Sequence, residues 1–191
     1  TDDIEKRYQL TVLGAIFETR KNEAIEQVIE EDSQSPAAES YRMIRSSLLL
    51  SSADHPPRTI LITSMTAQEG KTSTALNLAR AMAQMAGKVL IIDADMRKPR
   101  IHTLLNVPNN NGLSTYLSGN TDEKIVHRVP EKNISVIPSG PIPPNPVELI
   151  SSHRMIILLE DMAREYDFIF IDSPPIIHLA DGLILSTLVD G

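Results

Sequence analysis

The sequence contains no cysteine and no tryptophan, and only 4% of its 191 residues are aromatic. Without cysteine, the chain has no disulfide bond, no thiolate nucleophile and no zinc site with cysteine ligands. With so few aromatic residues, stacking on nucleic-acid bases is not expected as a mode of binding. The net charge is -7 and no cluster of five or more basic residues occurs, so neither nucleic acid nor an anionic membrane surface is expected as a partner.

Long apolar runs are also missing. No stretch approaches the roughly 18 apolar residues that a membrane-spanning helix needs, and the acidic N-terminus does not resemble a signal peptide. We therefore expect this stretch of chain to be soluble, in a reducing compartment that suits a protein without cysteine. The five histidines are scattered without metal-ligand spacing, which argues against a zinc site. What the sequence does contain is 41% hydrophobic residues, enough for one domain with a sizeable core.

Helices are expected in the N-terminal part of the chain, over residues 21–55. The first is predicted to be capped by Asn22 and to carry Ile25, Val28 and Ile29 on one face, at helical spacing. The second is predicted over 36–51, because the proline that opens it suits the first helical position, where the N–H group has no partner.

From residue 56 on, the pattern alternates between strands and helices, which predicts an α/β core over residues 56–191. Four short apolar runs, 59–63, 88–93, 134–138 and 168–172, lack the polar alternation of half-exposed strands. Such strands are buried on both faces. They predict a three-layer fold with a mostly parallel sheet between helices, preceded by the N-terminal helices.

Two longer helices are expected between these strands. One follows the first strand, with Leu78, Met82 and Met85 on one face and Gly87 as its end signal. The other is predicted over 145–165, because its first residues match a capping box with proline at the first helical position.

The most specific motif lies between the first predicted strand and the first long helix. It matches the phosphate-binding pattern G-x-x-x-x-G-K-[ST], with Met65 in place of the first glycine. Backbone N–H groups and a helix start hold the phosphates in such a loop, and Gly70 lets the backbone come close. Lys71 is expected to reach the β- and γ-phosphates, and the Thr72 hydroxyl to bind Mg²⁺. A surface turn is the alternative, but the position between strand and helix favours a nucleotide site, and with it a three-layer fold of the P-loop NTPase type. The candidate nucleotide-binding residues are Ala67, Gln68, Glu69, Gly70, Lys71, Thr72 and Ser73.

Carboxylates follow two of the other predicted strands. Asp93 and Asp95 end the second strand and are expected on one side of the chain, while Asp172 ends the fourth. At the carboxyl edge of a sheet, these groups could bind Mg²⁺ directly or through water, or take a proton from an attacking hydroxyl. The simpler alternative is an aspartate that only caps a turn. Two crowded carboxylates are costly without a cation, which favours a functional role.

These motifs together resemble those of the bacterial tyrosine kinases, or BY-kinases. Residues 89–97 (VLIIDADMR) and 168–175 (FIFIDSPP) resemble the family's Walker A-prime and Walker B motifs. The partition ATPases ParA and MinD share the fold, but they usually carry an extra lysine early in the phosphate loop, and residues 64–69 contain none. Further segments resembling the family are Arg97-Lys98-Pro99 with His102, Asn111-Gly112-Leu113-Ser114, Pro143-Pro144-Asn145-Pro146 and Glu148-Leu149.

The resemblance implies a protein-tyrosine autokinase that uses ATP, releases ADP and requires Mg²⁺. Lys71 would stabilise charge on the γ-phosphate, and Thr72 and Asp172 would organise the metal. Asp93 would act as the base or position the hydroxyl, and Asp95 would assist the metal. The roles of Asp93 and Asp95 are interchangeable at this point.

The resemblance also implies an assembly and a location. Glu39, Arg42 and Arg45 match the family's E-x-x-R-x-x-R element; from the residues alone they are an exposed helix face with an i,i+3 ion pair. In the family this element packs on a neighbouring subunit, which implies a homo-oligomeric ring, an octamer. The parent protein would regulate capsule or exopolysaccharide polymerisation and export at the cytoplasmic face of the bacterial inner membrane, with residues 1–20 as its juxtamembrane segment. Its partners would be a membrane co-polymerase region or activator protein and a tyrosine phosphatase.

One family feature is missing from the sequence. BY-kinases usually end in a tyrosine-rich tail, whereas the tyrosines here are Tyr8, Tyr41, Tyr116 and Tyr166, none of them clustered. We expect a further strand and such a tail after Gly191. If there is no tail, two other functions stay open. One is an ATP-binding scaffold that hydrolyses ATP slowly or not at all, and the other is a partition-type ATPase of the ParA/MinD class.

Overall fold

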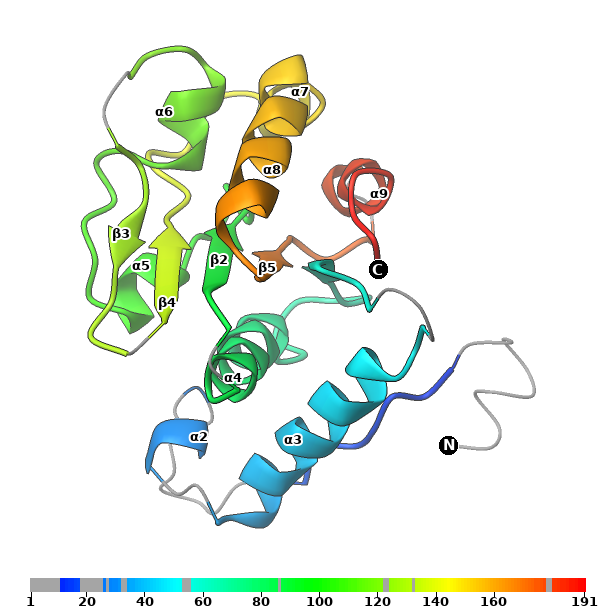
Figure 1. Ribbon diagram of the computed structural model, residues 1–191. Helices are drawn as coiled ribbons and strands as arrows, with labels where there is room; N and C mark the ends of the chain where they lie inside the picture. The colour runs from blue at the N-terminus through cyan, green and yellow to red at the C-terminus, as the bar shows by residue number, and fades with distance from the viewer. Residues whose placement is uncertain are drawn as a thin grey trace.

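The computed structural model in Figure 1 gives the arrangement of the elements. The structure describes residues 11–17, 26, 28–31, 34–52, 56–85, 87–121, 124–131, 133–177 and 180–191. The described strands are β1 (Thr59–Ile62), β2 (Val89–Asp93), β3 (His127–Arg128), β4 (Ile134–Ile137) and β5 (Phe168–Asp172). The described helices are α2 (Val28–Glu31), α3 (Pro36–Leu49), α4 (Lys71–Ala83), α5 (Ile101–Leu104), α6 (Leu113–Leu117), α7 (Pro146–Ile150), α8 (His153–Glu165) and α9 (Asp181–Ser186).

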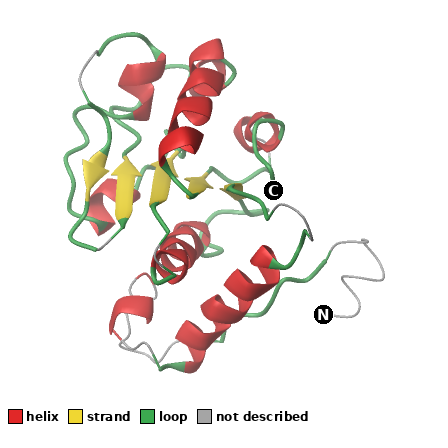
Figure 2. Cartoon of the chain, viewed as in Figure 1, coloured by secondary structure: helices red, strands yellow, loops and turns green. Residues whose placement is uncertain are grey.

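The strands form one sheet in the order β1-β5-β2-β4-β3, in which β3 is antiparallel and every other pairing is parallel. Figure 2 shows the sheet between two layers of helices, with α3 and α4 on one side and α7 and α8 on the other. This three-layer α/β arrangement confirms the predicted fold class. All four strands expected from apolar runs are present, each within one residue of its predicted ends.

The two hydrophobic clusters explain why the strands are apolar throughout. Every residue of β2 is buried, and side chains alternate between the faces of a strand. Val89 and Ile91 accordingly pack in the cluster that includes α3 and α4, while Leu90 and Ile92 pack in the cluster under α7 and α8. A polar residue on either face would have no water to contact.

Helix α3 packs on α4 as part of the first cluster. Ser35 is its N-cap, accepting a hydrogen bond from the Ala38 N–H at 3.1 Å, and proline occupies the start of the helix as predicted. Tyr41, Ile44 and Leu48 lie along the buried face, one helical turn apart. Val28 and Ile29 in α2 are also buried, whereas Asn22, the predicted cap, and Ile25, predicted on the same face, lie outside the described residues. The predicted boundaries at residues 20 and 55 stay predictions.

Three details of the expected secondary structure were wrong. The helix predicted over 145–165 is two helices, α7 and α8, which separate at Ser152, an extended residue that caps α8. The Asn145 side chain makes no capping bond; its amide donates to the Glu148 carboxylate at 2.9 Å. Met85 lies beyond the end of α4 and is 56% exposed, so it does not share the buried face of Leu78. The sequence also gave no signal for β3, because two residues are too few to show a period.

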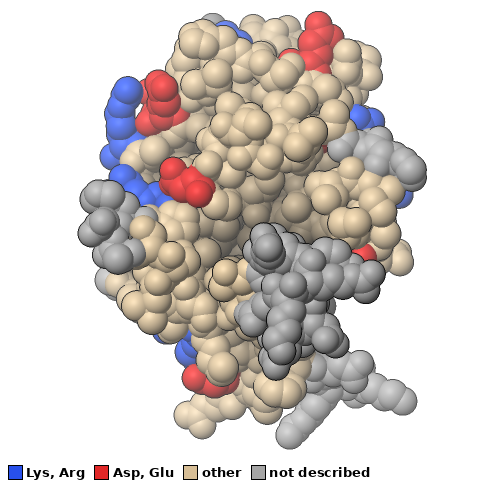
Figure 3. All heavy atoms as spheres, turned by 90° about the vertical axis from the view of Figure 1, so that its right-hand side faces the viewer, with Lys and Arg blue, Asp and Glu red and all other residues tan. Residues whose placement is uncertain are grey.

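The backbone of Gly191 continues the sheet at the free edge of β1. Its carbonyl accepts a hydrogen bond from the Leu61 N–H at 2.9 Å, and its N–H donates to the Thr59 carbonyl at 3.2 Å. None of the described helices combines the length and the apolar character needed to span a bilayer. The face in Figure 3 is mostly uncharged, with acidic and basic side chains scattered over it, in keeping with the absence of a basic cluster in the sequence.

Candidate active site

The phosphate loop joins β1 to α4, as the motif predicted. Gly70 is the N-cap of α4 and has φ +84°, a left-handed conformation that glycine adopts without strain. Its carbonyl accepts a hydrogen bond from the Thr74 N–H at 2.8 Å, which closes the first helical turn. Lys71 is the first residue of the helix, so the free N–H groups at the helix start lie at the loop. This arrangement can bind an anion.

Glu69 closes the loop with its side chain. Its carboxylate accepts hydrogen bonds from the Met65 N–H at 3.1 Å and from the Thr66 hydroxyl at 2.6 Å. The bond from Thr66 lowers the pKa of Glu69. The carboxylate is therefore committed to holding the loop in shape, and only the backbone of Glu69 is left to contact a phosphate. Gln68, another of the predicted nucleotide-binding residues, has φ +66°, a left-handed backbone conformation that is strained for a residue with a side chain.

The loop is tied to the segment that follows β5. The Ile176 N–H donates to the Ser64 carbonyl at 2.9 Å, and the Ile177 N–H donates to the Met65 carbonyl at 3.3 Å. These bonds fix the start of the loop against the prolines that follow Asp172.

Thr72 and Asp172 meet directly. The Thr72 hydroxyl donates to Oδ2 of Asp172 at 2.6 Å, so the helix start and the end of β5 are joined at the site. Asp172 is 2% exposed and its Oδ1 has no partner. Burial raises the pKa of Asp172 to about 6, although the bond from Thr72 and the charge of Lys71 act in the opposite direction.

Asp93 ends β2 beside Asp172, and the two residues are paired in the sheet register. Asp93 is fully buried; its Oδ2 accepts hydrogen bonds from the N–H groups of Arg100 and Ile101 at 3.2 and 3.1 Å. Its Oδ1 has no partner. Burial, followed by repulsion from Asp172, raises the pKa of Asp93 to about 8 when no cation is present.

Asp95 is in the loop after β2 and is half-buried. Its Oδ1 accepts hydrogen bonds from the N–H groups of Arg97 at 3.3 Å and Lys98 at 3.0 Å, so it does cap a turn, as the simpler alternative proposed. Its negative charge nevertheless contributes to the raised pKa values of Asp93 and Asp172, so its carboxylate lies near both of them.

Sequence reasoning missed one ion pair at this edge. The Nη2 atom of Arg97 lies 3.3 Å from Oδ2 of Asp181, the first residue of α9. Asp181 is 1% exposed, and its Oδ1 has no partner. No local pattern relates residues so far apart in the chain. Arg97 also lines a cavity of about 300 Å³ beside the phosphate loop. The other lining residues are Met65, Thr66, Ala67, Asp95, Lys98, Pro174, Pro175 and Ile177.

The donors at this edge suit Mg²⁺. Two buried carboxylate oxygens, Oδ1 of Asp93 and Oδ1 of Asp172, lack partners, and the Thr72 hydroxyl is bonded to the other oxygen of Asp172. Hard oxygen atoms of this kind are the ligands that Mg²⁺ prefers. Within the described part of the chain, no group of three or more His, Asp or Glu residues is close enough to hold a metal alone. The nucleotide phosphates would have to supply further ligands, as is usual for Mg²⁺.

The predicted oligomerisation residues lie on α3, away from the phosphate loop in the chain. Arg42 and Glu39 form the expected ion pair at 3.1 Å on the surface. Arg45 instead turns toward α4, where its guanidinium donates to the Ala81 carbonyl at 2.8 Å. Partial burial lowers the pKa of Arg45. Arg45 therefore already has an intramolecular partner.

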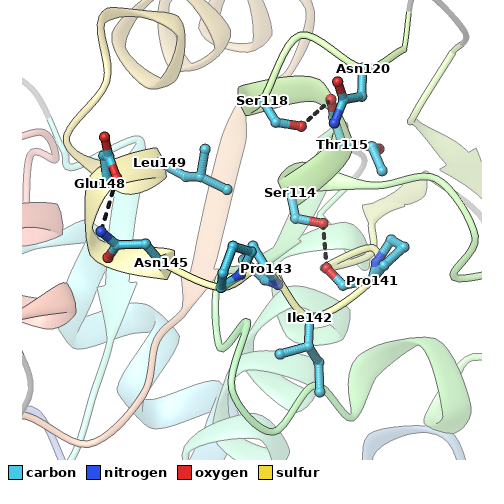
Figure 4. A pocket seen from close by; sticks show the side chains of 11 residues that line it. Ser114, Thr115, Ser118, Asn120, Pro141, Ile142, Pro143, Asn145, Glu148 and Leu149 are labelled. Atoms are coloured by element: carbon cyan, nitrogen blue, oxygen red, sulfur yellow. Dashed lines mark hydrogen bonds between the residues drawn. The ribbon is translucent and has the colours of Figure 1, made fainter.

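A second cavity, of about 350 Å³, lies between α6, α7 and the loop 141–145 (Figure 4). The Ser114 hydroxyl donates to the Pro141 carbonyl at 2.7 Å and joins its walls. Gly112 is needed beneath it, because a Cβ there would lie 2.2 Å from the Pro138 carbonyl. None of the predicted site residues lines this cavity.

Comparison with known proteins gives consistent matches. The sequence matches the family described as AAA domain over residues 57–188. It is 44% identical over 155 residues to tyrosine-protein kinase YwqD of Bacillus subtilis, covering 81% of this chain and 65% of that protein. It is 36% identical over 162 residues to the putative tyrosine-protein kinase CapB of Staphylococcus aureus, covering 84% of this chain and 71% of that protein. The match to tyrosine-protein kinase etk of Escherichia coli, 36% identical, covers 80% of this chain but 21% of that protein.

The structural matches agree with these relatives. The kinase domain of the Escherichia coli tyrosine kinase ETK superposes with a TM-score of 0.89 at 30% identity, covering 99% of this chain and 79% of that one. The chimerical protein CapA2B2 has the same TM-score at 37% identity, covering 98% and 80%. The septum site-determining protein MinD of Pyrococcus horikoshii, complexed with Mg-ADP, is more distant, with a TM-score of 0.60 at 25% identity over 70% of this chain and 55% of that one.

Proposed function

This chain belongs to the bacterial tyrosine-protein kinases, and from that premise we propose that it transfers the γ-phosphoryl group of ATP to tyrosine hydroxyls, its own among them. The chain spans 65% of the Bacillus relative and about a fifth of the Escherichia coli one, so the substrates and partners of the whole protein are part of the proposal. The observation that carries it is the junction of Thr72, Asp172 and Asp93 at the start of α4.

The phosphate loop would bind the triphosphate. The N–H groups of residues 67–73 and the start of α4 favour an anion there, and Lys71 would neutralise charge that develops on the transferring group. Positioning and electrostatic stabilisation supply most of the catalysis in phosphoryl transfer, because the protein forms no covalent intermediate with the phosphoryl group.

Thr72, Asp172 and Asp93 would hold Mg²⁺ beside the phosphates. The cation would neutralise negative charge on the phosphates. The unpartnered oxygens of Asp93 and Asp172 support this assignment, since two neighbouring buried carboxylates repel each other without a cation. Thr72 already orients one oxygen of Asp172 through its hydroxyl.

The acceptor hydroxyl would approach through the 300 Å³ cavity beside the loop, where Asp95 is the one carboxylate among the described lining residues. The roles of Asp93 and Asp95 were left interchangeable by the sequence. The position of Asp95 in this cavity favours Asp95 for positioning the hydroxyl and Asp93 for holding the metal. Full burial of Asp93 supports the same choice, because its Oδ2 is already bonded to the backbone of the next helix.

Substitution of the loop lysine and of the buried carboxylate tests the proposal. The chain is incubated with Mg-ATP and probed with an anti-phosphotyrosine antibody, alongside Lys71→Met and Asp93→Asn. We expect the signal to fall at least tenfold in both, because Lys71→Met loses the positive charge at the phosphates and Asp93→Asn loses a carboxylate that would hold Mg²⁺. An undiminished signal in either variant would remove that residue from the site.

The assembly and the biological setting are proposed from the family. Glu39, Arg42 and Arg45 would contact the neighbouring subunit of a ring, an octamer. The parent protein would act at the cytoplasmic face of the inner membrane in capsule or exopolysaccharide polymerisation and export, with a membrane co-polymerase region or activator and a tyrosine phosphatase as partners. Because Arg45 is bonded to Ala81, Arg42 and Glu39 are the residues freer to make this contact.

A partition-type ATPase is the second candidate, favoured by the structural match to MinD. The absence of lysine at residues 64–69 favours the kinase. Mass spectrometry for phosphotyrosine after incubation with ATP separates the kinase from an ATPase or a scaffold. Native mass at several nucleotide states separates a ring from a nucleotide-dependent dimer.

A further inference from the structure

The largest of the described cavities, about 800 Å³, lies at the edge of the sheet opposite the phosphate loop. Its walls come from the residues just before β2, β4 and β5, whereas the phosphate loop follows the carboxyl end of β1. We call it the basic cavity after its cations. The lining residues that matter here are Lys88, Arg128, Arg164, Glu131, Glu165 and Tyr166.

The charges in the basic cavity are not balanced. The Glu131 carboxylate forms an ion pair at 2.8 Å with Arg80 of α4, which does not line the cavity. Arg164 forms an ion pair at 2.7 Å with Asp161 on the surface. Among the described residues, no carboxylate is within ion-pair distance of Lys88 or Arg128. Of the acidic side chains in the cavity, Glu165 alone is left to offset these cations, so the cavity favours a further negative charge.

We propose that Tyr166 is a phosphorylation site, modified by a second copy of this chain, and that the basic cavity stabilises its phosphate. This inference rests on the proposed kinase function. A phosphotyrosine carries about -1.5 to -2 charges at neutral pH and three acceptor oxygens, which suit nearby lysine and arginine side chains.

The other described tyrosines are poorer acceptors. Tyr41 is 1% exposed in the interior of α3, where burial raises its pKa, so no kinase could reach its hydroxyl without unfolding the helix. Tyr116 packs under Arg154, whose guanidinium carbon lies 4.8 Å from the ring centroid. Tyr8 lies outside the described residues. Tyr166 lines an open cavity while its backbone is fixed, because its carbonyl accepts a bond from Arg58 at 2.8 Å.

The sheet requires that the phosphoryl donor be bound to another molecule. Tyr166 comes just before β5 and Asp172 ends it, so the strand separates them by about 20 Å at roughly 3.3 Å per residue. A reacting hydroxyl must come within about 3.5 Å of the phosphorus. The Tyr166 hydroxyl therefore cannot reach the phosphate loop of its own chain, and the reaction must occur between two copies.

The chemistry balances within the proposed activity. The bond between the γ-phosphorus of ATP and the oxygen that bridges to the β-phosphate breaks, and ADP leaves with that electron pair. A new bond forms from the same phosphorus to Oη of Tyr166. The phenolic proton passes to a carboxylate of the copy that holds ATP, and from there to solvent.

A mixed reaction tests the site. The donor is the Tyr166→Phe chain, which keeps its phosphate loop intact; the acceptor is the tagged Lys71→Met chain, which cannot transfer phosphate itself. After incubation with Mg-ATP, we expect mass spectrometry to find phosphate on Tyr166 of the tagged chain. A tagged Lys71→Met chain that also carries Tyr116→Phe should be modified equally, whereas one that carries Tyr166→Phe should lose most of its phosphotyrosine.

A random copolymer of glutamate and tyrosine, added as an independent substrate, separates this inference from the kinase function. If the donor phosphorylates the copolymer but leaves Tyr166 unmodified, the inference fails and the kinase function stands. If neither is phosphorylated, both fail.

The role of the basic cavity has its own readout. The second ionisation of a phosphotyrosine has a pKa near 6, and neighbouring cations lower it. In ³¹P NMR of the modified Lys71→Met chain, we expect this pKa below that of a free phosphotyrosine peptide, and returning toward it in the Arg128→Gln variant. An unshifted value in the chain without Arg128→Gln would overturn the role of the cavity.

Discussion

Asp93 and Asp172 are paired at the last register position of β2 and β5, and each has one carboxylate oxygen without a partner. The parallel register brings the two groups side by side, and burial keeps water from separating their charges. The Thr72 hydroxyl is bonded to one of the two aspartates. A divalent cation at this pair would relieve the repulsion between the two carboxylates.

The stability of the chain without nucleotide should fall as pH rises. The pKa of Asp93 is about 8 in the folded state and that of Asp172 about 6, against about 3.9 for an unfolded aspartate. The folded state therefore keeps protons that the unfolded chain has lost. Their stabilisation is complete below about pH 4 and is lost as pH rises through about 6 for Asp172 and about 8 for Asp93. Urea unfolding without Mg²⁺ at several pH values measures this.

Asp93→Asn is the matched variant for that measurement, because asparagine has nearly the same shape and no proton to lose. Its free energy of unfolding should change less between about pH 6 and 8 than that of the unsubstituted chain. Equal slopes for the two proteins would mean that Asp93 is ionised in the folded chain.

Binding of Mg-ADP should show the opposite pH dependence. A cation binds the ionised carboxylates, so protons compete with it at Asp93 and Asp172. The rise in melting temperature on adding Mg-ADP should be larger at about pH 8 than at about pH 6. Asp172→Asn should remove most of the Mg²⁺ contribution while ADP alone still binds the loop. A shift that is the same with and without Mg²⁺ at both pH values would contradict a metal at this pair.

Gln68→Gly should stabilise the phosphate loop. Gln68 has φ +66°, which costs a residue with a side chain about 1 kcal/mol or more, while glycine adopts it freely. Part of this gain is offset because glycine is more flexible in the unfolded chain, so we expect a net increase of about 0.5 kcal/mol in the free energy of unfolding. Gln68→Ala, which keeps the strained backbone, is the control and should give no gain. A loss of stability in Gln68→Gly would show that the glutamine side chain contributes more than its backbone costs.

Arg97 and Asp181 should be coupled in stability. Arg97→Ala would leave the carboxylate of Asp181 buried without its cation, at a cost of about 2 kcal/mol, since Arg97 itself is partly exposed. Asp181→Asn should cost less, and the double variant should cost less than the sum of the two. Urea unfolding of the four proteins gives the coupling energy, and additive costs would show that the pair contributes nothing.

Much of the fold could be predicted from the sequence because the signals are local. Apolar runs without polar alternation predicted β1, β2, β4 and β5. The helix break at Ser152 and the strand β3 could not be predicted, since a serine in an amphipathic run is compatible with a continuous helix and a two-residue strand shows no period.

The sequence by itself determined the phosphate loop and the strand ends that carry Asp93, Asp95 and Asp172, because a glycine, a lysine and a threonine at the start of a helix form a local anion site. Only the tertiary structure decided how these groups meet. The order β1-β5-β2 brings the two buried aspartates together, and the packing of the elements turns Arg45 toward α4 and pairs Arg97 with Asp181. Those relationships join residues distant in the chain, and they depend on register and burial, which no local pattern contains.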